Sequence, residues 1–241
     1  MLTVLGVEAG KLNRSLAALL AVAGPVLIGI LGFFMATRGD DPQTWDLWMR
    51  NGIALWAFFM MPMCVTALTA LVAQMEHAPK SWDHLRALPL PRWKLYAAKA
   101  LSAFAVVAAM SAGVIVATWL AGSVAQLVMP AMAPQGALDL AAQAKLVGMV
   151  LLAGLLMFAV QLWVALRFAS FVPALAMGIG GTFFSVAATS AEAGVFFPWQ
   201  MPVNMLAKES WRVETALTLG LVGGIVALAA MMLHLSRREM V

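Results

Sequence analysis

The chain has 241 residues, of which 63% are hydrophobic and only 11% are charged, and its formal net charge is +4. So few charged residues cannot cover a water-soluble globule of this length, whereas the apolar sequence is enough for about six membrane spans. The polar gaps between the apolar runs are at most about 20 residues long, which is too short for a separate nucleotide-binding or catalytic domain. The composition therefore predicts an all-α integral membrane protein that forms a single transmembrane domain over residues 1–241.

Cysteine and basic-residue usage exclude two further classes. The single cysteine, Cys64, lies in an apolar run and cannot form an internal disulfide, and no cluster of Cys and His has metal-ligand spacing. The sequence pI of about 9.6 could indicate nucleic acid binding. However, the Lys and Arg residues lie in short gaps beside the apolar runs, where membrane topology and anionic lipid headgroups account for them. We expect membrane lipids as neighbours, but no nucleic acid, no metal and no cofactor on this chain.

Residues 1–14 are predicted to form an amphipathic helix at the membrane interface. Glu8 and Lys11 fall on one face of this helix, and the opposite face is apolar, with Leu5, Ala9, Leu12 and Leu16. A frayed cytosolic tail is the alternative, because so short a segment gives only weak evidence of amphipathicity. A signal peptide is disfavoured, since the apolar run that follows is about 22 residues long and carries no small-residue cleavage site.

Six apolar runs of membrane length follow, and we predict spans at 16–35, 52–73, 96–121, 145–166, 171–188 and 215–235. Pro25 predicts a kink in the first span, and Pro62 predicts either a packed kink or a hinge in the second. Small residues recur every fourth position in three spans, which predicts close helix packing. Most of these faces should pack within the chain, and at most one should form a dimer interface. The three faces are Ala105, Ala109, Gly113 and Ala117; Ala174, Gly178 and Thr182; and Ala216, Gly220 and Gly224.

The polar segment 76–95 separates the second span from the third. Ser81 can cap a helix that begins at Trp82, and Pro89 and Pro91 stop it about two turns later. We therefore predict a short cytoplasmic helix at 81–88. Its apolar face, formed by Trp82, Leu85 and Leu88, could contact a soluble partner, and Arg86 lies on another face.

The stretch 192–214 is too polar for a span and too apolar for a free loop. A pair of short interfacial or re-entrant helices between the fifth and sixth spans fits it best. We expect this segment to act as an extracellular gate or substrate contact, with these residues: Glu192, Phe197, Pro198, Trp199 and Pro202. For Glu192, a carboxylate that simply reaches water at the interface is the alternative.

The distribution of positive charge predicts the orientation. Ten of the 15 Lys and Arg residues fall on the side that holds both predicted termini, the 76–95 segment and the turn at 167–170, and five fall on the other side. Because positive residues are enriched in cytoplasmic loops, both termini and the 76–95 segment are predicted to be cytoplasmic.

An intramembrane enzyme is disfavoured by the positions of the three histidines. His77 and His84 lie in the cytoplasmic segment and His234 lies at the cytoplasmic end of the last span, so none is placed to activate Ser111 or Ser185 inside the bilayer. A scaffold or assembly factor that transports nothing is the other alternative, and hydropathy alone does not distinguish it from a transporter.

Two motifs resemble the permease subunits of ABC-2 type transporters, in particular the small six-helix permeases of lantibiotic-immunity and bacitracin-resistance exporters. The first motif resembles their first intracellular loop and runs Glu76, Trp82, Leu88-Pro89, Arg92 and Lys99. The second, Phe197-Pro198-Trp199-Gln200-Met201-Pro202, precedes the last span. The resemblance implies that residues 81–88 are a coupling helix that docks on a separate ABC ATP-binding subunit, through Glu76, Trp82, Leu85, Arg86, Leu88 and Arg92. Glu76 is expected to pair with a basic residue of the permease or of the ATPase.

The same resemblance implies an exporter subunit in the inner membrane of a bacterial cell. ATP and Mg would be bound by the ATPase, and this chain itself would not be an enzyme. A second copy, or a related permease, would complete the transport path. The expected substrate is amphipathic or hydrophobic: a peptide antibiotic, a lipid or a drug.

Overall fold

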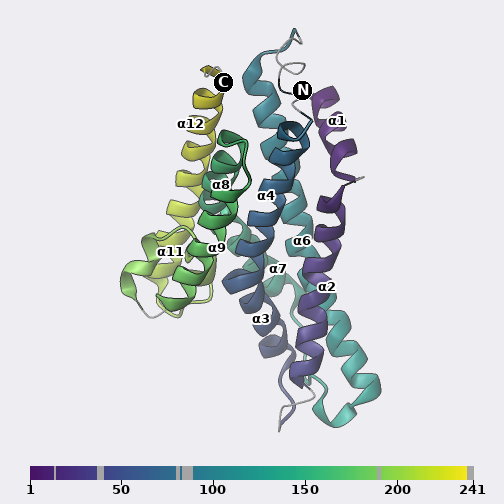
Figure 1. The fold of residues 1–241 in the computed structure, drawn as a ribbon. Helices are drawn as coiled ribbons and strands as arrows, with labels where there is room; N and C mark the ends of the chain where they lie inside the picture. Colours follow the sequence, from purple (N-terminus) through teal and green to yellow (C-terminus); the bar gives the residue numbers. More distant parts are fainter. Residues whose placement is uncertain (14, 37–40, 80–81, 83–88, 189–190, 238–241) are drawn as a thin grey trace.

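A helical bundle accounts for the part of the chain that the computed structural model describes, which is residues 1–13, 15–36, 41–79, 82, 89–188 and 191–237 (Figure 1). Within these residues there is no strand, apart from an isolated β-bridge between Thr44 and Gln135. The N terminus and the C-terminal end lie at the same end of the bundle (Figure 1). The predicted class, an all-α membrane protein, is confirmed.

The helices fall into two groups by length. The long or membrane-length segments are α2 (Leu16–Ala36), α3 (Trp45–Leu55) with the π-helix η1 (Trp56–Met60) and α4 (Met61–His77), α6 (Arg92–Val128), α7 (Leu140–Ala153) with α8 (Leu155–Arg167), α9 (Val172–Ala187), and α11 (Ser210–Thr218) with the π-helix η4 (Leu219–Gly223) and α12 (Gly224–Arg237). The short ones are α1 (Leu2–Asn13), η2 (Pro130–Met132), η3 (Glu192–Phe196) and α10 (Met201–Asn204).

Four helices among the described residues are long and apolar enough to cross a membrane: Leu16–Met35, Trp45–His77, Arg92–Val128 and Ser210–Arg237. A fifth crossing is possible if α7 and α8, which meet at a bend of 42°, count as one span. α9 is apolar but has 16 residues, fewer than the roughly 20 that a span needs. Six apolar helical segments thus match the six predicted spans in order, while the number that cross the membrane stays a prediction.

Local chemistry explains several of the helix starts. The Ser15 hydroxyl accepts the amide N–H of Ala17 at 3.1 Å before α2, and the Thr44 hydroxyl accepts that of Leu47 at 3.3 Å before α3. Asp139 caps α7 by accepting the Ala142 N–H at 3.0 Å. Such side-chain acceptors satisfy amide donors that have no partner in the first turn. The irregularity expected near Pro62 appears as the π-helix η1, which ends immediately before α4.

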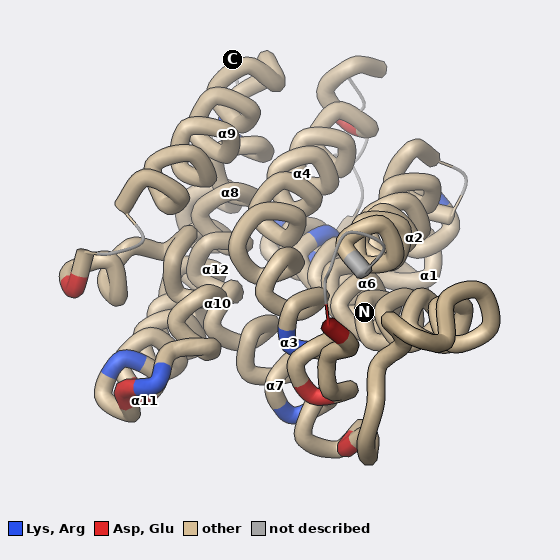
Figure 2. Tube along the Cα trace, turned by 90° about the horizontal axis from the view of Figure 1, so that it is seen from below, with Lys and Arg blue, Asp and Glu red and all other residues tan. Residues whose placement is uncertain are grey.

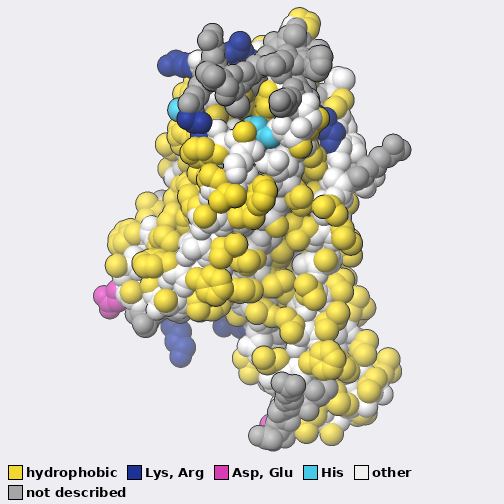
Figure 3. Space-filling view, viewed as in Figure 1, with side chains coloured by type: hydrophobic (Ala, Val, Ile, Leu, Met, Phe, Trp, Pro, Cys, Tyr) yellow, Lys and Arg dark blue, Asp and Glu magenta, His cyan; other side chains and the backbone are white. Residues whose placement is uncertain are grey.

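The helices pack in a definite order across the bundle. α6 packs along α2 and also contacts α1, while α4 packs against α8 and α9, and α12 packs against α8 and α6. Seen along the bundle, α4 and α8 lie between α2 on one side and α9 on the other (Figure 2). Hydrophobic side chains cover the middle of the surface, and Lys and Arg side chains gather at the end that holds both termini (Figure 3). This distribution suits a bundle surrounded by lipid.

Each of the three predicted small-residue faces is packed within the chain at its glycine, although Ala105 and Ala109 of the first face are exposed. A Cβ added at the central glycine of each face would meet a neighbouring helix, as three pairs show: Gly113 against Pro25 of α2, Gly178 against Thr66 of α4, and Gly220 against Ala153 of α7. Small residues allow two helix backbones to approach closely in a membrane. Intrachain packing therefore explains these glycines without a dimer interface.

Two helices are longer than the predicted spans. α6 has 37 residues and runs past both ends of 96–121, and the α3–η1–α4 helix of 33 residues begins before residue 52. At 1.5 Å per residue these helices are about 55 and 50 Å long, well beyond the roughly 30 Å of a bilayer core. Trp45 and Trp48 fall in the gap between the predicted spans 16–35 and 52–73, yet they belong to α3 and are buried against α6. The indole N–H of Trp48 donates to the Thr118 carbonyl of α6 at 2.8 Å.

Candidate functional site

Four charged side chains from three separate helices meet at the end of the bundle that holds the termini. We call Glu8, Lys11, Glu76 and Lys99 the ionic cluster. Lys99 Nζ donates to Glu8 Oε2 and to Glu76 Oε1, at 2.8 Å each. Lys11 Nζ donates to Glu8 Oε1 at 2.9 Å and to Glu76 Oε1 at 2.6 Å. Each lysine thus bridges both carboxylates, and the formal charges of the four groups balance.

The ionic cluster lies in the protein interior. Lys99 is 1% exposed, Glu76 2% and Glu8 6%, and only Lys11 reaches the surface. Taking isolated charges out of water costs several kcal/mol each, so a buried charge is tolerated only when its partners are close and well oriented. The double pairing at each lysine meets that condition, and charge-assisted hydrogen bonds at this distance are among the stronger ones in proteins.

The three helices that supply the ionic cluster are α1, α4 and α6. Glu8 and Lys11 are three residues apart on α1 and therefore share one of its faces. Glu76 is in the last turn of α4, and Lys99 is two turns into α6. The cluster therefore ties α1 to the helix that enters the 80–88 segment and to the helix that leaves it.

The orientation of α1 differs from the predicted one. The helix is present, but its charged face points into the protein instead of into water, because Glu8 is paired with Lys99. Its apolar residues Leu5, Ala9 and Leu12 line a groove of about 780 Å³ together with α2 and α6. α1 is thus bound to the bundle through its polar side, and its apolar side faces the groove.

The protonation of Lys11 follows from these contacts. Burial alone would lower the pKa of Lys11, but the hydrogen bonds to Glu76 and Glu8 and their negative charges outweigh it and raise the pKa above the ordinary 10.5. A folded-state pKa above the unfolded one stabilises the fold fully below pH 10.5, and this stabilisation is lost as the pH rises through the raised pKa. The lysine therefore stays charged throughout the neutral range.

Trp82 covers the inner side of the ionic cluster. Its ring is 7% exposed and lies 5.6 Å from the rings of both Tyr96 and His77, measured between centroids. Lys99 Nζ is 6.0 Å from the centre of the Trp82 ring, and the indole N–H donates to His77 Nδ1 at 3.1 Å. Trp82 is thus anchored to α4 and α6 of its own chain.

The predicted interface residues are distributed as follows. Glu76 is part of the ionic cluster, Trp82 lies beside it with its ring centre 6.0 Å from Lys99 Nζ, and Arg92 is exposed at the start of α6. Leu85, Arg86 and Leu88, like the predicted helix start at Ser81, lie outside the described residues. Docking of this segment on an ATPase stays a prediction. The expectation that Glu76 pairs with a base of the permease is met by Lys11 and Lys99.

Sequence reasoning missed Glu8 and Lys11 as members of the site. Their signal was faint, because a Glu and a Lys three residues apart are common on surface helices. Lys99 gave a clearer one, since it is a charged residue flanked by Ala98 and Ala100 inside an apolar helix, and such a residue almost always has a partner. Among the described residues, no group of three or more His, Cys, Asp or Glu could hold a metal ion.

The 192–214 segment forms a second polar site at a different place in the bundle. Gln200 Nε2 donates to the Ser185 carbonyl of α9 at 2.8 Å, and Asn204 Nδ2 donates to the Gln200 carbonyl at 2.8 Å. Arg212 Nε donates to Asn204 Oδ1 at 3.0 Å. These bonds connect the end of α9 to the start of α11 through α10, and Gln200 and Asn204 are both buried.

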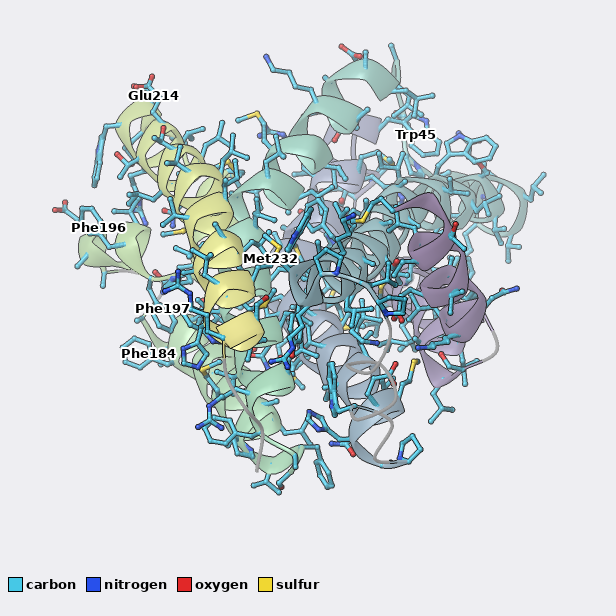
Figure 4. The ribbon with its side chains drawn as sticks, turned by 90° about the horizontal axis from the view of Figure 1, so that it is seen from above. Trp45, Phe184, Phe196, Phe197, Glu214 and Met232 are labelled. Atoms are coloured by element: carbon cyan, nitrogen blue, oxygen red, sulfur yellow. The ribbon has the colours of Figure 1, made fainter. Side chains whose placement is uncertain are left out.

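Aromatic rings pack around this second site. Phe197 lies edge-on to Phe184 of α9 at 5.1 Å and stacks on Trp199 at 5.4 Å, whereas Phe196 points away from the bundle (Figure 4). Trp199 is buried, and its indole N–H has no hydrogen-bond partner among the described residues. The other predicted gate residues differ in exposure: Pro202 is buried, Pro198 is half-buried and Glu192 is exposed. The short helices η3 and α10 are the structure expected for this segment.

A comparison with protein families places these features in context. The family described as ABC-2 family transporter protein matches residues 4–185, a range that contains the whole ionic cluster and the connection from α4 to α6. No curated protein and no solved structure matches the chain. The family match covers more than half of the sequence, and the chain therefore belongs to the ABC-2 family of transporter proteins.

Proposed function

We propose that this chain is the permease subunit of an ATP-driven exporter and works with a separate ABC ATP-binding subunit. Its family and its apolar helices make it a multi-pass membrane component of an ABC transporter. The polar gaps are too short to hold a nucleotide-binding domain. ATP and Mg would therefore bind to the partner, and this chain would supply the path through a bacterial inner membrane with both termini in the cytoplasm.

The single observation that supports coupling most directly is the ionic cluster. A movement of the 80–88 segment must pass into α4 or α6, and Glu76 and Lys99 hold these two helices together with α1. Buried charge pairs allow little slippage, because separating them leaves an unpaired charge in a medium of low dielectric constant. We infer that α1, α4 and α6 move together when the partner subunit closes on ATP.

The composition of the complex tests this proposal. The chain should co-purify in detergent with a co-expressed ABC ATP-binding subunit. Native mass spectrometry should then show two permease and two ATPase chains, since one chain supplies only half of a symmetric path. Vanadate-sensitive ATP hydrolysis should accompany this complex. A chain that remains a monomer, with no ATP-binding partner when both proteins are co-expressed, would instead favour a scaffold or assembly role.

The 192–214 segment is our candidate for the gate on the other side of the membrane. Its support is the polar connection from Ser185 through Gln200 and Asn204 to Arg212, which holds re-entrant backbone in place where lipid could not satisfy it. The stacked Phe197 and Trp199 would offer an apolar surface to an amphipathic or hydrophobic substrate such as a peptide antibiotic, a lipid or a drug.

Asn204→Leu should impair transport without disturbing assembly. The change removes one buried and one partly buried hydrogen bond, and each buried group left unsatisfied costs about 1–3 kcal/mol, so the segment should lose its fixed position. ATPase co-purification should be unchanged, because the ionic cluster is untouched, while ATP-driven extrusion of fluorescent amphipathic dyes and fluorescent phospholipid from vesicles should fall at least tenfold. Asn51→Leu, at an exposed asparagine, is the control. Loss of the complex in Asn204→Leu would mean that the segment is only structural.

A further inference from the structure

A groove lies between the start of α6 and the end of α12, apart from both sites described above. It has a volume of about 370 Å³ and is lined by Trp93, Ala229, Met232, Leu233, Ser236 and Arg237. The groove opens on the outer surface of the bundle, since Leu233 is 59% exposed and Trp93 49%. Met232 lies on the side of α12 that faces the rest of the bundle (Figure 4).

The groove is apolar along its length and basic at one end. Ala229, Met232 and Leu233 form apolar walls over one and a half turns of α12, and Arg237 follows in the last turn. Lys94 follows the lining residue Trp93 in the first turn of α6 and carries a second positive charge, with its Nζ 5.8 Å from the centre of the Trp93 ring. No acidic side chain is among the described residues that line the groove. Arg237 in the lining and Lys94 beside Trp93 therefore give this groove positive charge without a described carboxylate in its lining.

An unsatisfied hydroxyl gives an independent indication of a ligand. Ser236 Oγ is buried at the basic end of the groove, and it has no hydrogen-bond partner among the described residues. A serine hydroxyl in the last turn of a helix usually bonds to a carbonyl of the preceding turn or to water. A buried hydroxyl without a partner is costly, so a ligand oxygen that accepts its proton would be favoured.

The position of the groove identifies the kind of ligand. Its basic end is formed by the first turn of α6 and the last turn of α12. These turns lie at the end of the bundle that holds both termini, where Lys and Arg side chains gather (Figures 1 and 3). Tryptophan and basic residues at such helix ends mark the level of the lipid headgroups. Basic pockets between helices on the cytoplasmic side of a membrane are suited to anionic headgroups.

We propose that this groove binds one anionic phospholipid. An acyl chain lies along Ala229, Met232 and Leu233, and the phosphate accepts hydrogen bonds from Ser236, Arg237 and Lys94. Among the described residues that line the larger groove beside α1, there is neither lysine nor arginine. These described lining residues offer an apolar chain a surface but give a headgroup no positive charge. The basic groove would therefore distinguish lipids by charge at a fixed point between α6 and α12.

Native mass spectrometry of the chain released from nanodiscs of equal phosphatidylglycerol and phosphatidylcholine tests the site. The wild type should retain phosphatidylglycerol in preference to phosphatidylcholine. Arg237→Gln or Lys94→Gln should each lower this retention about fivefold, and the double variant should lower it more, because each surface cation contributes a similar attraction. Ser236→Ala should lower retention with the charge unchanged. Arg50→Gln, which removes an exposed cation elsewhere in the chain, should have no effect.

Three outcomes would overturn the proposal. Equal retention of the two lipids by the wild type would remove the charge selectivity. Unchanged phosphatidylglycerol retention in the Arg237→Gln, Lys94→Gln double variant would place the bound lipid elsewhere. A fall in the dimeric fraction or in ATPase co-purification, with lipid retention unaffected, would show that another protein surface covers the groove. Leu233→Trp, which fills the apolar part and leaves both cations, should also reduce retention if the acyl chain lies there.

Discussion

Lys99→Met should destabilise the detergent-solubilised chain by about 3–5 kcal/mol. The change leaves Glu8 with one cationic partner instead of two, and it removes a buried positive charge beside Glu76. The midpoint of thermal unfolding should fall by about 10 °C. We expect the effect to be largely electrostatic, since methionine fills much of the volume of the lysine stem. The quantity to measure is the midpoint of thermal unfolding of the purified permease, monitored by size-exclusion chromatography.

A second substitution separates charge imbalance from lost packing. Glu8→Gln in the Lys99→Met background removes one negative charge as well, and leaves Lys11 and Glu76 as a balanced pair at 2.6 Å. The double variant should recover much of the lost stability, and a double-mutant cycle measures the coupling between Glu8 and Lys99. Arg50→Gln, which breaks an exposed pair with Asp46, should cost under about 1 kcal/mol. If Lys99→Met were as mild as Arg50→Gln, the ionic cluster would not hold these helices together.

Trp82→Ala should have the second largest effect, and it should act on stability and coupling together. Truncating a buried tryptophan costs about 3–5 kcal/mol, here through lost contacts with Tyr96, His77 and Lys99. The connection between α4 and α6 would then lose its anchor, so ATP hydrolysis by the complex should continue without transport. Trp82→Phe keeps a ring but loses the hydrogen bond to His77 and should be intermediate. Trp211→Ala, at a half-exposed indole, is the control.

The same variant distinguishes two roles for Trp82. A side chain that only inserted into the ATPase would reduce co-purification when truncated and would leave the isolated permease as stable as before. A side chain packed on its own chain must also lower the unfolding midpoint of the isolated permease. The 7% exposure of Trp82 leads us to expect the second result. A stable Trp82→Ala permease that no longer binds its ATPase would return Trp82 to the role of a partner contact.

Much of the fold could be predicted from the sequence because lipid imposes simple rules. Apolar runs of about 20 residues locate the helices, and the repeats around Gly178 and Gly220 locate close crossings. Helix ends were harder to place. Hydropathy detects only the apolar part of a helix, whereas the backbone hydrogen bonds of α6 begin at Arg92, before the apolar part starts. For the same reason the predicted second span begins at residue 52, whereas α3 begins at Trp45 beside charged residues.

The candidate site was only half predictable. Glu76 and Trp82 lie close together in the sequence, and the resemblance to a family motif singled them out. Glu8 is 91 residues from Lys99, and no periodicity relates two positions on different helices. The pairing depends on how α1 folds back against α6, which is a property of tertiary packing. The two hydrogen bonds of Asn204 were likewise not predictable, because an asparagine at the end of a short helix is ordinary until its burial is known.

The interruptions in the helices have a mechanical consequence. The rods α3–η1–α4, α7–α8 and α11–η4–α12 each contain a π-helix or a bend, and these joints touch: Met61 meets Gly154, and Ala153 meets Gly220. α6 runs for 37 residues without such a joint, whereas α2 carries Pro25 inside its helix. A continuous rod carries a tilt applied at one end to the other, whereas a jointed rod absorbs part of it as bending. A push applied at the end that holds the termini would therefore swing α6 as a stiff lever, while the jointed rods flexed halfway along the bundle.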